Sequence, residues 1–433
     1  MRVVFLVFIF FASLVASDAK IKYERVLLNI EKHYFKAFSK DELISKSIDE
    51  FLQNTPYLIE SEKQNKKQKL YKIKKSNEKL ERLVELLIKK GFSKNEIYEM
   101  LINSCMNLLD AHSRYLDKEQ MQELRIKTEG VFVGLGINLS KVDNSLIVID
   151  VLKNSPASKF GIKVSDIVLK IDGVTCDQVS LDRAIELLRK DVGGLVKLSL
   201  KRDEALIEIE LKRETIEIET LTFKRVENKI LYFKISSFDA NIAEKISSKI
   251  KEYQELSRAI IIDLRGNPGG LVSQAVEVAD MFLNRGNIMT QVGRGHGNKK
   301  SYDASKDKTL TSLPLAILVD SNTASSAEIL SGALQIHHRA TLFGERTFGK
   351  GSVESLYTIT KDESLSLTVA HYFLADSSTI EGVGILPDYE VNTLVKNGRD
   401  ESLEAAKEFL HNKDNFTKKY PLQMSGVCTK EEK

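Results

Sequence analysis

The sequence predicts a multidomain α+β protein in which a helical region precedes a small β-rich domain and an α/β core. Three observations support this fold class. Apolar residues recur at helical spacing over residues 20–128, short β-type runs and turn residues fill residues 129–213, and buried strands alternate with helices over residues 214–398. A chain of 433 residues is too long for one core, so we expect separate domains, with a charged tail over residues 399–433.

The N-terminus has the pattern of a secretory signal. Arg2 precedes an unbroken apolar run over residues 3–11, and small residues follow as far as Ser17. The apolar stretch is shorter than the roughly 20 residues that span a bilayer. We therefore expect residues 1–19 to be a signal peptide cleaved near Ser17 or Ala19, and the protein to be exported, periplasmic or otherwise extracytoplasmic. The alternative is an uncleaved signal that keeps the protein at the membrane.

Composition excludes some classes of partner and cofactor. The net charge is only +3, so no nucleic-acid partner is expected. The three cysteines, Cys105, Cys176 and Cys428, are widely spaced and odd in number, which shows no disulfide framework. Core packing is the preferred interpretation for Cys105. No His or Cys pair has metal-ligand spacing, and we expect neither a metal nor another cofactor.

The helical region has clear start and stop signals. Helical periodicity covers residues 26–38 and 43–52, and an amphipathic stretch over residues 81–90 stops at Gly91. Residues 93–96 form a capping box that starts another helix, expected to run to about residue 109. Eight lysines lie between residues 61 and 79. They favour a solvated helix or loop over contact with an anionic membrane. These helices are candidate elements for assembly of a homo-oligomer.

The next two regions differ in the kind of strand they contain. In the β-rich region we expect one helix, and the predicted strands are Leu146–Val151, Ile167–Ile171, Val196–Leu200 and Leu206–Leu211. In the α/β region, continuous apolar runs predict strands buried on both faces. The strands expected there are Ile230–Phe238, Ala259–Leu264, Leu315–Val319, Ser352–Ile359 and Leu365–Phe373.

A serine cluster joins a buried strand to a helix. Ser325 lies in the segment Asp320–Glu328, directly before the predicted helix. A helix N-terminus offers free N–H groups and a positive dipole end, which can stabilise the oxyanion formed when a serine attacks a carbonyl. The alternative is a plain N-cap cluster of serines.

A glycine-rich loop carries Lys350. The segment Gly344–Gly351 resembles a phosphate-binding loop in its spacing, but Gly351 stands where Ser or Thr is required, and a strand follows instead of a helix. Phosphate binding is therefore rejected. A lysine in such a loop can be desolvated and act as a base, although an ordinary lysine is almost fully charged at neutral pH.

Two other glycine-rich segments can bring backbone N–H groups close to a ligand. Asp263–Gly270 follows a buried strand, where a structural turn is the equally plausible alternative. Phe132–Ile137 opens the β-rich region and offers successive N–H groups that could bind a terminal carboxylate while a peptide adds to the sheet edge. Any glycine hairpin looks similar, so neither segment identifies a function alone.

Several motifs follow one another in a fixed order between about residues 105 and 390. Beside the Ser325 cluster they are Leu109–Ser113 with Tyr115-Leu116, Gly134–Ile137, Ser155–Ala157, Asp263–Gly270, Thr347–Val353 and Gly384–Asp388. Together they resemble the carboxyl-terminal processing, or tail-specific, serine proteases. The resemblance implies a PDZ domain over residues 129–213, a crotonase-like ββα protease core over residues 214–398, and a serine-type endopeptidase activity.

The resemblance also implies roles for individual residues. It implies that Ser325 is the nucleophile, that Lys350 is its general base, and that backbone N–H groups of Gly269 and Ser326 form the oxyanion hole. No His–Asp pair is needed for such a dyad.

The resemblance further implies how the substrate binds. The PDZ domain would bind the free C-terminus of an exported protein or peptide, through the substrate-binding residues Gly134, Leu135, Gly136 and Ile137.

The chain departs from the family pattern at three places. Glu354 occupies the position of a glutamine that helps to place the lysine, so it belongs to the expected catalytic set. Residues 375–378 replace a Pro-Ser-Gly-Arg turn, and residues 56–95 look like an insertion. Because Ser325 and Lys350 are both retained, we expect an active exported endoprotease. A catalytically weakened adaptor or scaffold that binds tails remains the alternative, and Glu354 favours it.

Overall fold

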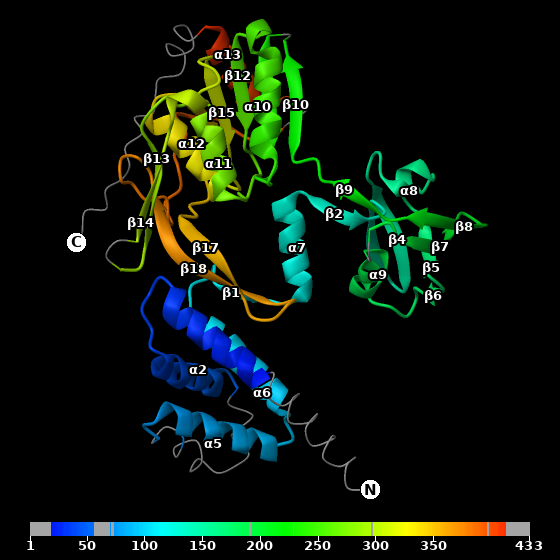
Figure 1. The fold of residues 1–433 in the computed structure, drawn as a ribbon. Helices are drawn as coiled ribbons and strands as arrows, with labels where there is room; N and C mark the ends of the chain where they lie inside the picture. The colour runs from blue at the N-terminus through cyan, green and yellow to red at the C-terminus, as the bar shows by residue number, and fades with distance from the viewer. Residues whose placement is uncertain are drawn as a thin grey trace. The chain divides into compact units, whose positions relative to one another are not determined.

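The protein forms two compact units. One, the small unit, consists of Arg125–Thr220 with Asp239–Asn241, and the rest of the chain makes the large unit. Both are drawn in Figure 1, a computed structural model. The described residues are 19–55, 70, 73–189, 192–227, 229–295, 298–395 and 398–412. The predicted signal peptide, except its last residue, and most of the lysine-rich segment lie outside them.

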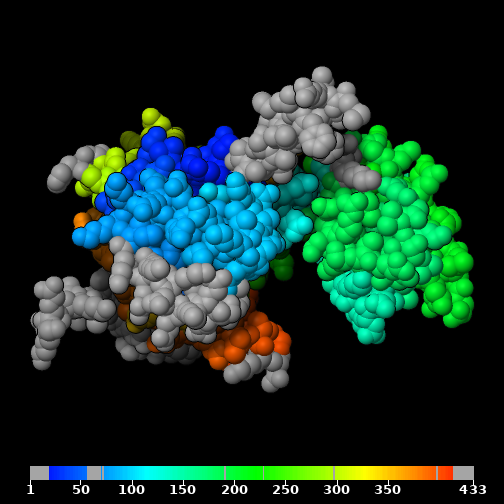
Figure 2. Space-filling view, turned by 90° about the horizontal axis from the view of Figure 1, so that it is seen from below, coloured from blue at the N-terminus to red at the C-terminus, as the bar shows by residue number. Residues whose placement is uncertain are grey.

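Helices form the first part of the large unit. Residues 19–33 are helical, followed by α2 (Lys40–Asn54), α5 (Ser76–Lys89) and α6 (Lys94–Met106). Their apolar faces share one core, which includes buried Cys105. The outer face of α5, light blue in Figure 2, carries mostly polar residues together with the exposed Ile88. Among the described helices, none combines the length and apolar character needed to cross a bilayer.

Local signals place the start of α6 and the end of α5 where the sequence predicts them. The Ser93 hydroxyl accepts a hydrogen bond from Glu96 N–H, and the Glu96 carboxylate accepts one from Ser93 N–H, as in the predicted capping box. α5 ends just before Gly91, whose φ of +96° suits glycine. Both local predictions are confirmed.

A six-stranded sheet forms the centre of the large unit. Its order is β10-β11-β12-β15-β16-β19, and all neighbours are parallel except β10 and β11. The strands are β10 (Leu221–Val226), β11 (Ile230–Ile235), β12 (Ala259–Asp263), β15 (Leu315–Val319), β16 (Thr341–Gly344) and β19 (Tyr389–Glu390). Every residue of β12 and β15 is buried, as their continuous apolar runs predict.

Helices cover both faces of this sheet. α10 (Ile242–Tyr253), α11 (Val272–Asp280) and α12 (Ser326–Ile336) pack on one face, against alternate strand residues. α13 (Glu401–His411) packs on the other face through Ala406 and Phe409. Burial on both faces is why a period-2 pattern is missing from the central strands. Two single 3₁₀ turns, Gln254–Leu256 and Lys306–Lys308, complete this part.

A second sheet of the large unit joins segments that are far apart in sequence. Its order is β1-β18-β13-β14, and β17 also pairs with β18. The strands are β1 (Arg114–Leu116), β13 (Asn287–Gly293), β14 (Lys299–Asp303), β17 (Ser352–Thr358) and β18 (Ser364–Phe373). Leu365 and Leu367 of β18 pack into the helical core described above. This sheet therefore connects the helical part to the loop that carries Lys350.

The small unit is β-rich. Its five-strand path is β3-β4-β5-β7-β8, with β6 paired to β5 and a separate β2–β9 ribbon. The elements are α7 (Lys118–Glu129, which begins in the large unit), β2 (Val131–Gly134), β3 (Ile137–Val142), β4 (Ser145–Val151), α8 (Pro156–Lys159), β5 (Ile167–Ile171), β6 (Val174–Thr175), α9 (Leu181–Leu188), β7 (Leu195–Arg202), β8 (Ala205–Lys212) and β9 (Glu214–Glu217).

The architecture confirms the predicted α+β class and corrects some elements. β1 is a strand inside the region predicted to be helical, because its partner, β18, lies some 250 residues later and leaves no local signal. α6 stops at Met106, short of the expected end near residue 109. The β13–β14 hairpin was not predicted, since its second strand is mostly polar and exposed.

Candidate active site

Ser325 lies where β15 gives way to α12. It is the N-cap of α12, with φ +56° and ψ −120°, a conformation that is strained for a residue with a side chain. Its N–H donates to Glu328 Oε2 at 2.8 Å. A strained serine at the start of a helix is suited to present its hydroxyl to a substrate. The sequence correctly predicted that this residue lies at the strand–helix junction.

Glu328 ties the serine segment to the lysine loop. Its carboxylate is fully buried and accepts four hydrogen bonds. Oε1 accepts from Thr347 Oγ1 at 2.5 Å and Gly349 N–H at 2.8 Å. Oε2 accepts from Ser325 N–H at 2.8 Å and Lys350 N–H at 2.9 Å. Burial raises the pKa of Glu328, and these hydrogen bonds oppose that shift.

Sequence reasoning assigned Glu328 no role. The Ser-x-x-Glu spacing of a capping box from Ser325 to Glu328 was the available signal. That signal explains only the bond to Ser325. The bonds to the lysine loop join residues about 20 positions apart, and no local pattern encodes them.

Lys350 makes an ion pair with Glu354. Lys350 Nζ lies 2.8 Å from Glu354 Oε2, and the two side chains are 24% and 22% exposed. Ser352 Oγ donates to the other carboxylate oxygen, Oε1, at 2.6 Å. A register shift in β17 between Val353 and Glu354 re-aims the side chains there. Between the two described side chains of Lys350 and Ser325 there is no hydrogen bond.

Gly269 touches the serine. A Cβ atom on Gly269 would lie 2.8 Å from Ser325 Cβ and 3.1 Å from Ser326 N, and its φ is +106°, so only glycine fits. Its N–H donates to Asn267 Oδ1 at 2.8 Å. Ser326 N–H starts α12 and donates to no described residue. The two expected oxyanion donors are thus adjacent, but in this conformation only the one on Ser326 is free.

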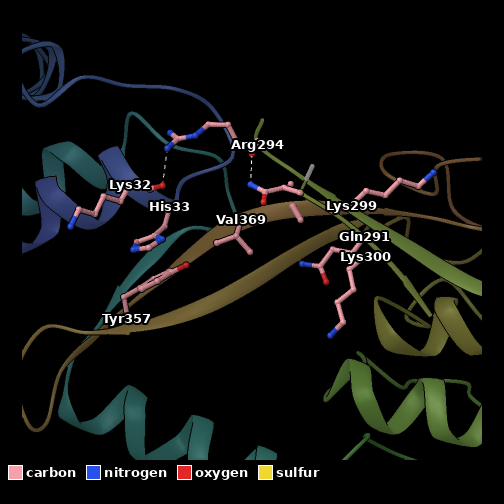
Figure 3. Close-up of a pocket in the computed structure, with 11 residues that line it drawn as sticks. Lys32, His33, Gln291, Arg294, Lys299, Lys300, Tyr357 and Val369 are labelled. Carbon is pink, nitrogen blue, oxygen red and sulfur yellow. Dashed lines mark hydrogen bonds between the residues drawn. The ribbon is translucent and has the colours of Figure 1, made fainter. Parts of the chain in front are cut away.

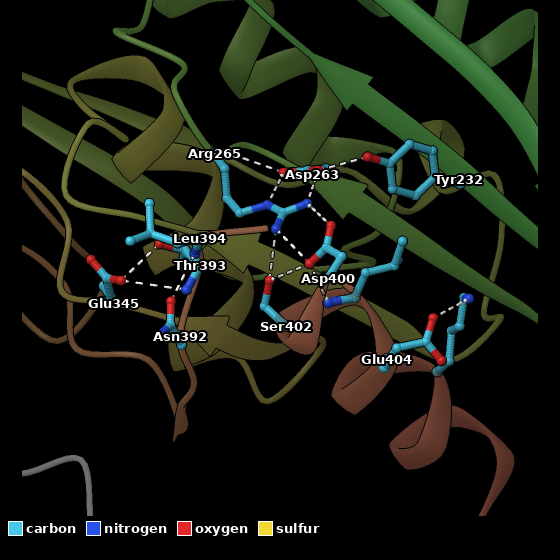
Figure 4. A network of polar contacts seen from close by, with 12 residues as sticks. Tyr232, Asp263, Arg265, Glu345, Asn392, Thr393, Leu394, Asp400, Ser402 and Glu404 are labelled. Atoms are coloured by element: carbon cyan, nitrogen blue, oxygen red, sulfur yellow. Dashed lines mark hydrogen bonds and ion pairs between the residues drawn. The ribbon is translucent and has the colours of Figure 1, made fainter. Parts of the chain in front are cut away.

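A charged network lies at the start of the loop that leads from β12 to Gly269 (Figure 4). Arg265 binds the buried carboxylate of Asp263 and also Asp400, the N-cap of α13, at 2.7–2.9 Å. Ser402 Oγ accepts from Arg265 and Tyr232 O–H donates to Asp263. The network joins the C-terminal helix to the strand end that leads to Gly269.

A basic cavity of about 470 Å³ lies elsewhere in the large unit. The Arg294 guanidinium donates hydrogen bonds to backbone carbonyls, including those of Glu31 and Lys32 at 2.8 and 2.7 Å. His33 stacks on Tyr357, and its pKa is lowered by burial and by the neighbouring cations. The lysine side chains at the rim extend away from one another (Figure 3). The cavity contains no residue of the Ser325 or Lys350 segments, and its donors do not converge on a ligand position.

The residues predicted to bind a terminal carboxylate, Gly134–Ile137, lie at the start of the small unit's sheet. Gly136 has φ +77°, and a Cβ atom there would lie 2.2 Å from Ser155 Cβ. Leu135 O accepts from Ala157 N–H and Gly136 O accepts from Leu152 N–H, both at 2.9 Å. The N–H groups of Leu135 and Gly136 donate to no described residue. Ile137 begins β3, which among the described strands pairs only with β4.

Comparison with known proteins identifies both parts. Residues 229–391 match the family model of peptidase family S41, and residues 133–212 match that of the PDZ domain. The carboxy-terminal-processing protease of Bartonella bacilliformis is 34% identical over 304 residues, 68% of this chain and 70% of that protein. The carboxyl-terminal-processing protease of Picosynechococcus is 34% identical over 304 residues, 68% of this chain and 73% of that protein.

Other matches cover different shares of the relative. Carboxy-terminal processing protease CtpA of Bacillus subtilis is 34% identical over 292 residues, 65% of this chain, and the chain spans 62% of its length. The solved photosystem II D1 C-terminal processing protease aligns with 90% of this chain and 97% of its own, at 20% identity and a TM-score of 0.46. By sequence identity and by the match of its α/β core, this chain belongs to peptidase family S41, among relatives named carboxy-terminal-processing proteases, and it carries a PDZ domain.

Proposed function

We propose that the protein is an exported endopeptidase in which Ser325 is the nucleophile and Lys350 the general base. The observation that carries this proposal is the Glu328 carboxylate, which binds the backbone N–H groups of both residues. Through this one group the serine at a helix start and the lysine of a separate loop are held as neighbours. Such positioning is what a two-residue dyad requires.

The reaction follows from these groups. Lys350 releases Glu354, loses its extra proton to solvent and accepts the Ser325 hydroxyl proton as Oγ attacks the substrate carbonyl. The oxyanion is stabilised by Ser326 N–H and, once it turns from Asn267, by Gly269 N–H. Collapse expels the amine, which takes the proton from Lys350. Water then hydrolyses the acyl-serine with Lys350 again as base.

The test is cleavage of an unfolded protein by the purified chain. Ser325→Ala and Lys350→Ala should each abolish cleavage and leave the circular dichroism spectrum unchanged. Each loss should be about as large as that of the double variant, because the paired groups act as one unit. Cleavage by Ser325→Ala at the wild-type rate would refute the mechanism.

The ion pair of Lys350 with Glu354 favours a second candidate function. A lysine that remains paired as an ammonium ion cannot accept a proton, and the protein would then bind tails as an adaptor. Wild-type protein that binds a peptide tail but cleaves nothing from acid to alkaline pH would support this candidate.

We further propose that the PDZ domain binds the free C-terminus of a substrate through residues 134–137. The unpaired edge of β3 can accept an extended peptide, and the free N–H groups of Leu135 and Gly136 can bind its carboxylate. A peptide with a free C-terminal carboxylate should bind full-length Ser325→Ala about 10- to 100-fold more tightly than the same peptide with an amidated C-terminus. This is the difference expected from the loss of hydrogen bonds to a charged group. Equal affinities in a titration would contradict the carboxylate site.

Export remains part of the proposal. It is supported by the basic start, apolar run and small residues of the first 19 positions. The mass of the protein recovered from outside the cytoplasm would show whether it is cleaved near Ser17 or Ala19 or retained as a membrane anchor. Self-association through the helices of residues 20–110 is likewise proposed, and would be measured by sedimentation.

A further inference from the structure

Tyr372 contacts the backbone of both residues of the proposed dyad. It lies in β18 and is 1% exposed. Its hydroxyl oxygen is 2.6 Å from the carbonyl oxygen of Lys350 and 3.2 Å from that of Ser325. A single buried phenol thus lies between two segments that are otherwise 25 positions apart in sequence.

The hydroxyl matters most to Lys350. A phenol has one proton to donate, and the shorter distance assigns it to the Lys350 carbonyl. The Ser325 carbonyl already accepts from Glu328 N–H at 2.8 Å and Ile329 N–H at 3.0 Å. The Lys350 carbonyl accepts from no other described residue. Without the hydroxyl, the part-buried carbonyl of Lys350 would lose its hydrogen-bond donor.

The phenol is a fixed and permanent donor. Tyr372 N–H donates to Gly351 O at 3.0 Å, so the same residue binds the lysine loop by its backbone as well. Burial raises the pKa of Tyr372 well above its ordinary value, and the carboxylates of Glu328, Glu381 and Glu354 raise it further. The hydroxyl therefore keeps its proton at neutral pH.

We propose that Tyr372 is a positioning residue that, together with Glu328, fixes Ser325 and Lys350 relative to each other. Glu328 binds the N–H groups of these two residues, and Tyr372 lies at their carbonyl groups. The peptide groups on both sides of Lys350 are thereby held, and the Ser325 carbonyl, held by Glu328 N–H and Ile329 N–H, lies 3.2 Å from the same hydroxyl. This inference rests on the proposed Ser325–Lys350 dyad.

Such positioning has a kinetic consequence. Proton transfer from serine to lysine depends steeply on distance, and a shift of about 1 Å at a reacting group can cost about 100-fold in rate. Loss of the hydroxyl leaves the Lys350 carbonyl without its donor and lets the peptide group after Lys350 turn, while the backbone bonds of Gly351 to Tyr372 and Glu381 remain. We therefore expect the activation of Ser325 to weaken while substrate affinity is retained.

The test is Tyr372→Phe in the full chain, which removes only the hydroxyl oxygen. A fluorophosphonate probe reacts with an activated serine: the Ser325 Oγ–P bond forms, the P–F bond breaks, fluoride leaves and the serine proton passes to Lys350. Labelling is followed by intact mass against time. The rate constant should fall about 10- to 100-fold while the final extent of labelling stays complete.

Extent and rate separate the possible roles. A merely structural role would leave fewer folded molecules, and so lower the extent without changing the rate constant of those that react. Tyr23→Phe is the matched control, since it removes a buried hydroxyl that contacts Ser47 Oγ at 3.0 Å in the helical part. It should label at the wild-type rate, and Ser325→Ala should not label.

Three outcomes would overturn the inference. One is a wild-type rate constant in Tyr372→Phe, and another is a reduced extent with an unchanged rate constant. Both leave the proposed function intact, because the wild type still labels at Ser325. The third is a wild type that shows no Ser325-dependent labelling at any pH, which overturns the dyad together with the role of Tyr372 in it.

Discussion

Replacement of Glu354 by glutamine should make the enzyme faster at neutral pH. In the structure the Glu354 carboxylate lies 2.8 Å from Lys350 Nζ, and a lysine must be uncharged before it can act as a base. Glutamine keeps the side-chain length. It can accept from Lys350 through its oxygen and donate to Ser352 through its amide, so the hydrogen bonds survive and only the charge disappears.

The size of the effect follows from the geometry. Two unit charges 2.8 Å apart attract by about 1.5 kcal/mol even at the dielectric constant of water. The side chains of this pair are about three-quarters buried, so solvent screening does not remove that attraction. About 1.4 kcal/mol is tenfold in a protonation equilibrium. Glu354→Gln should therefore cleave about tenfold faster than the wild type near neutral pH.

The assay is the rate of peptide cleavage between about pH 6 and pH 10, the range over which a lysine loses its proton. The rate of Glu354→Gln should exceed that of the wild type about tenfold near neutral pH, and the two rates should converge as the pH rises.

Glu363→Gln is the matched control. Glu363 pairs with Lys22 at 2.8 Å, each side chain 21% exposed, in a part of the large unit that does not contain the Lys350 loop. This variant should keep the wild-type profile. If the Glu354→Gln and wild-type profiles superimpose, Glu354 does not limit Lys350 as a base, and the case for a weakened enzyme loses its main support.

Two further predictions concern carboxylates that accept several hydrogen bonds. Glu328→Gln should lower the free energy of unfolding by about 3 kcal/mol and the cleavage rate by about 100-fold. The four donors around Glu328 use both carboxylate oxygens, and an amide has only one acceptor oxygen. Urea unfolding followed by circular dichroism measures the first effect, and the cleavage assay measures the second. Asp400→Asn should cost about 2 kcal/mol at neutral pH. Burial raises the pKa of Asp400, but the bonds from Arg265 and Leu403 N–H lower it overall, so its stabilising effect is present above its ordinary pKa near 3.8 and lost as pH falls below that. The wild type and Asp400→Asn should therefore converge in stability on acidification; a constant difference down to about pH 2 would contradict this.

The sequence by itself determined the elements that carry strong local signals. The continuous apolar runs of β12 and β15 predict buried parallel strands, because a strand covered on both faces has no reason to alternate. The capping box at Ser93 fixes the start of α6. The order of glycine-rich and serine motifs predicted the protease family, which the comparisons confirm.

Tertiary structure alone decided which of these groups meet. Nothing in the local sequence joins β1 to β18, or the Glu328 carboxylate to the Lys350 loop, since those contacts depend on the path of the chain through two sheets. The sequence also left open whether Glu354 would point at Lys350. The ion pair forms because Lys350 and Glu354 lie on one short loop-to-strand segment whose register shift re-aims the side chains. Residue types can therefore be read along the chain, but their hydrogen-bond partners are set by long-range packing.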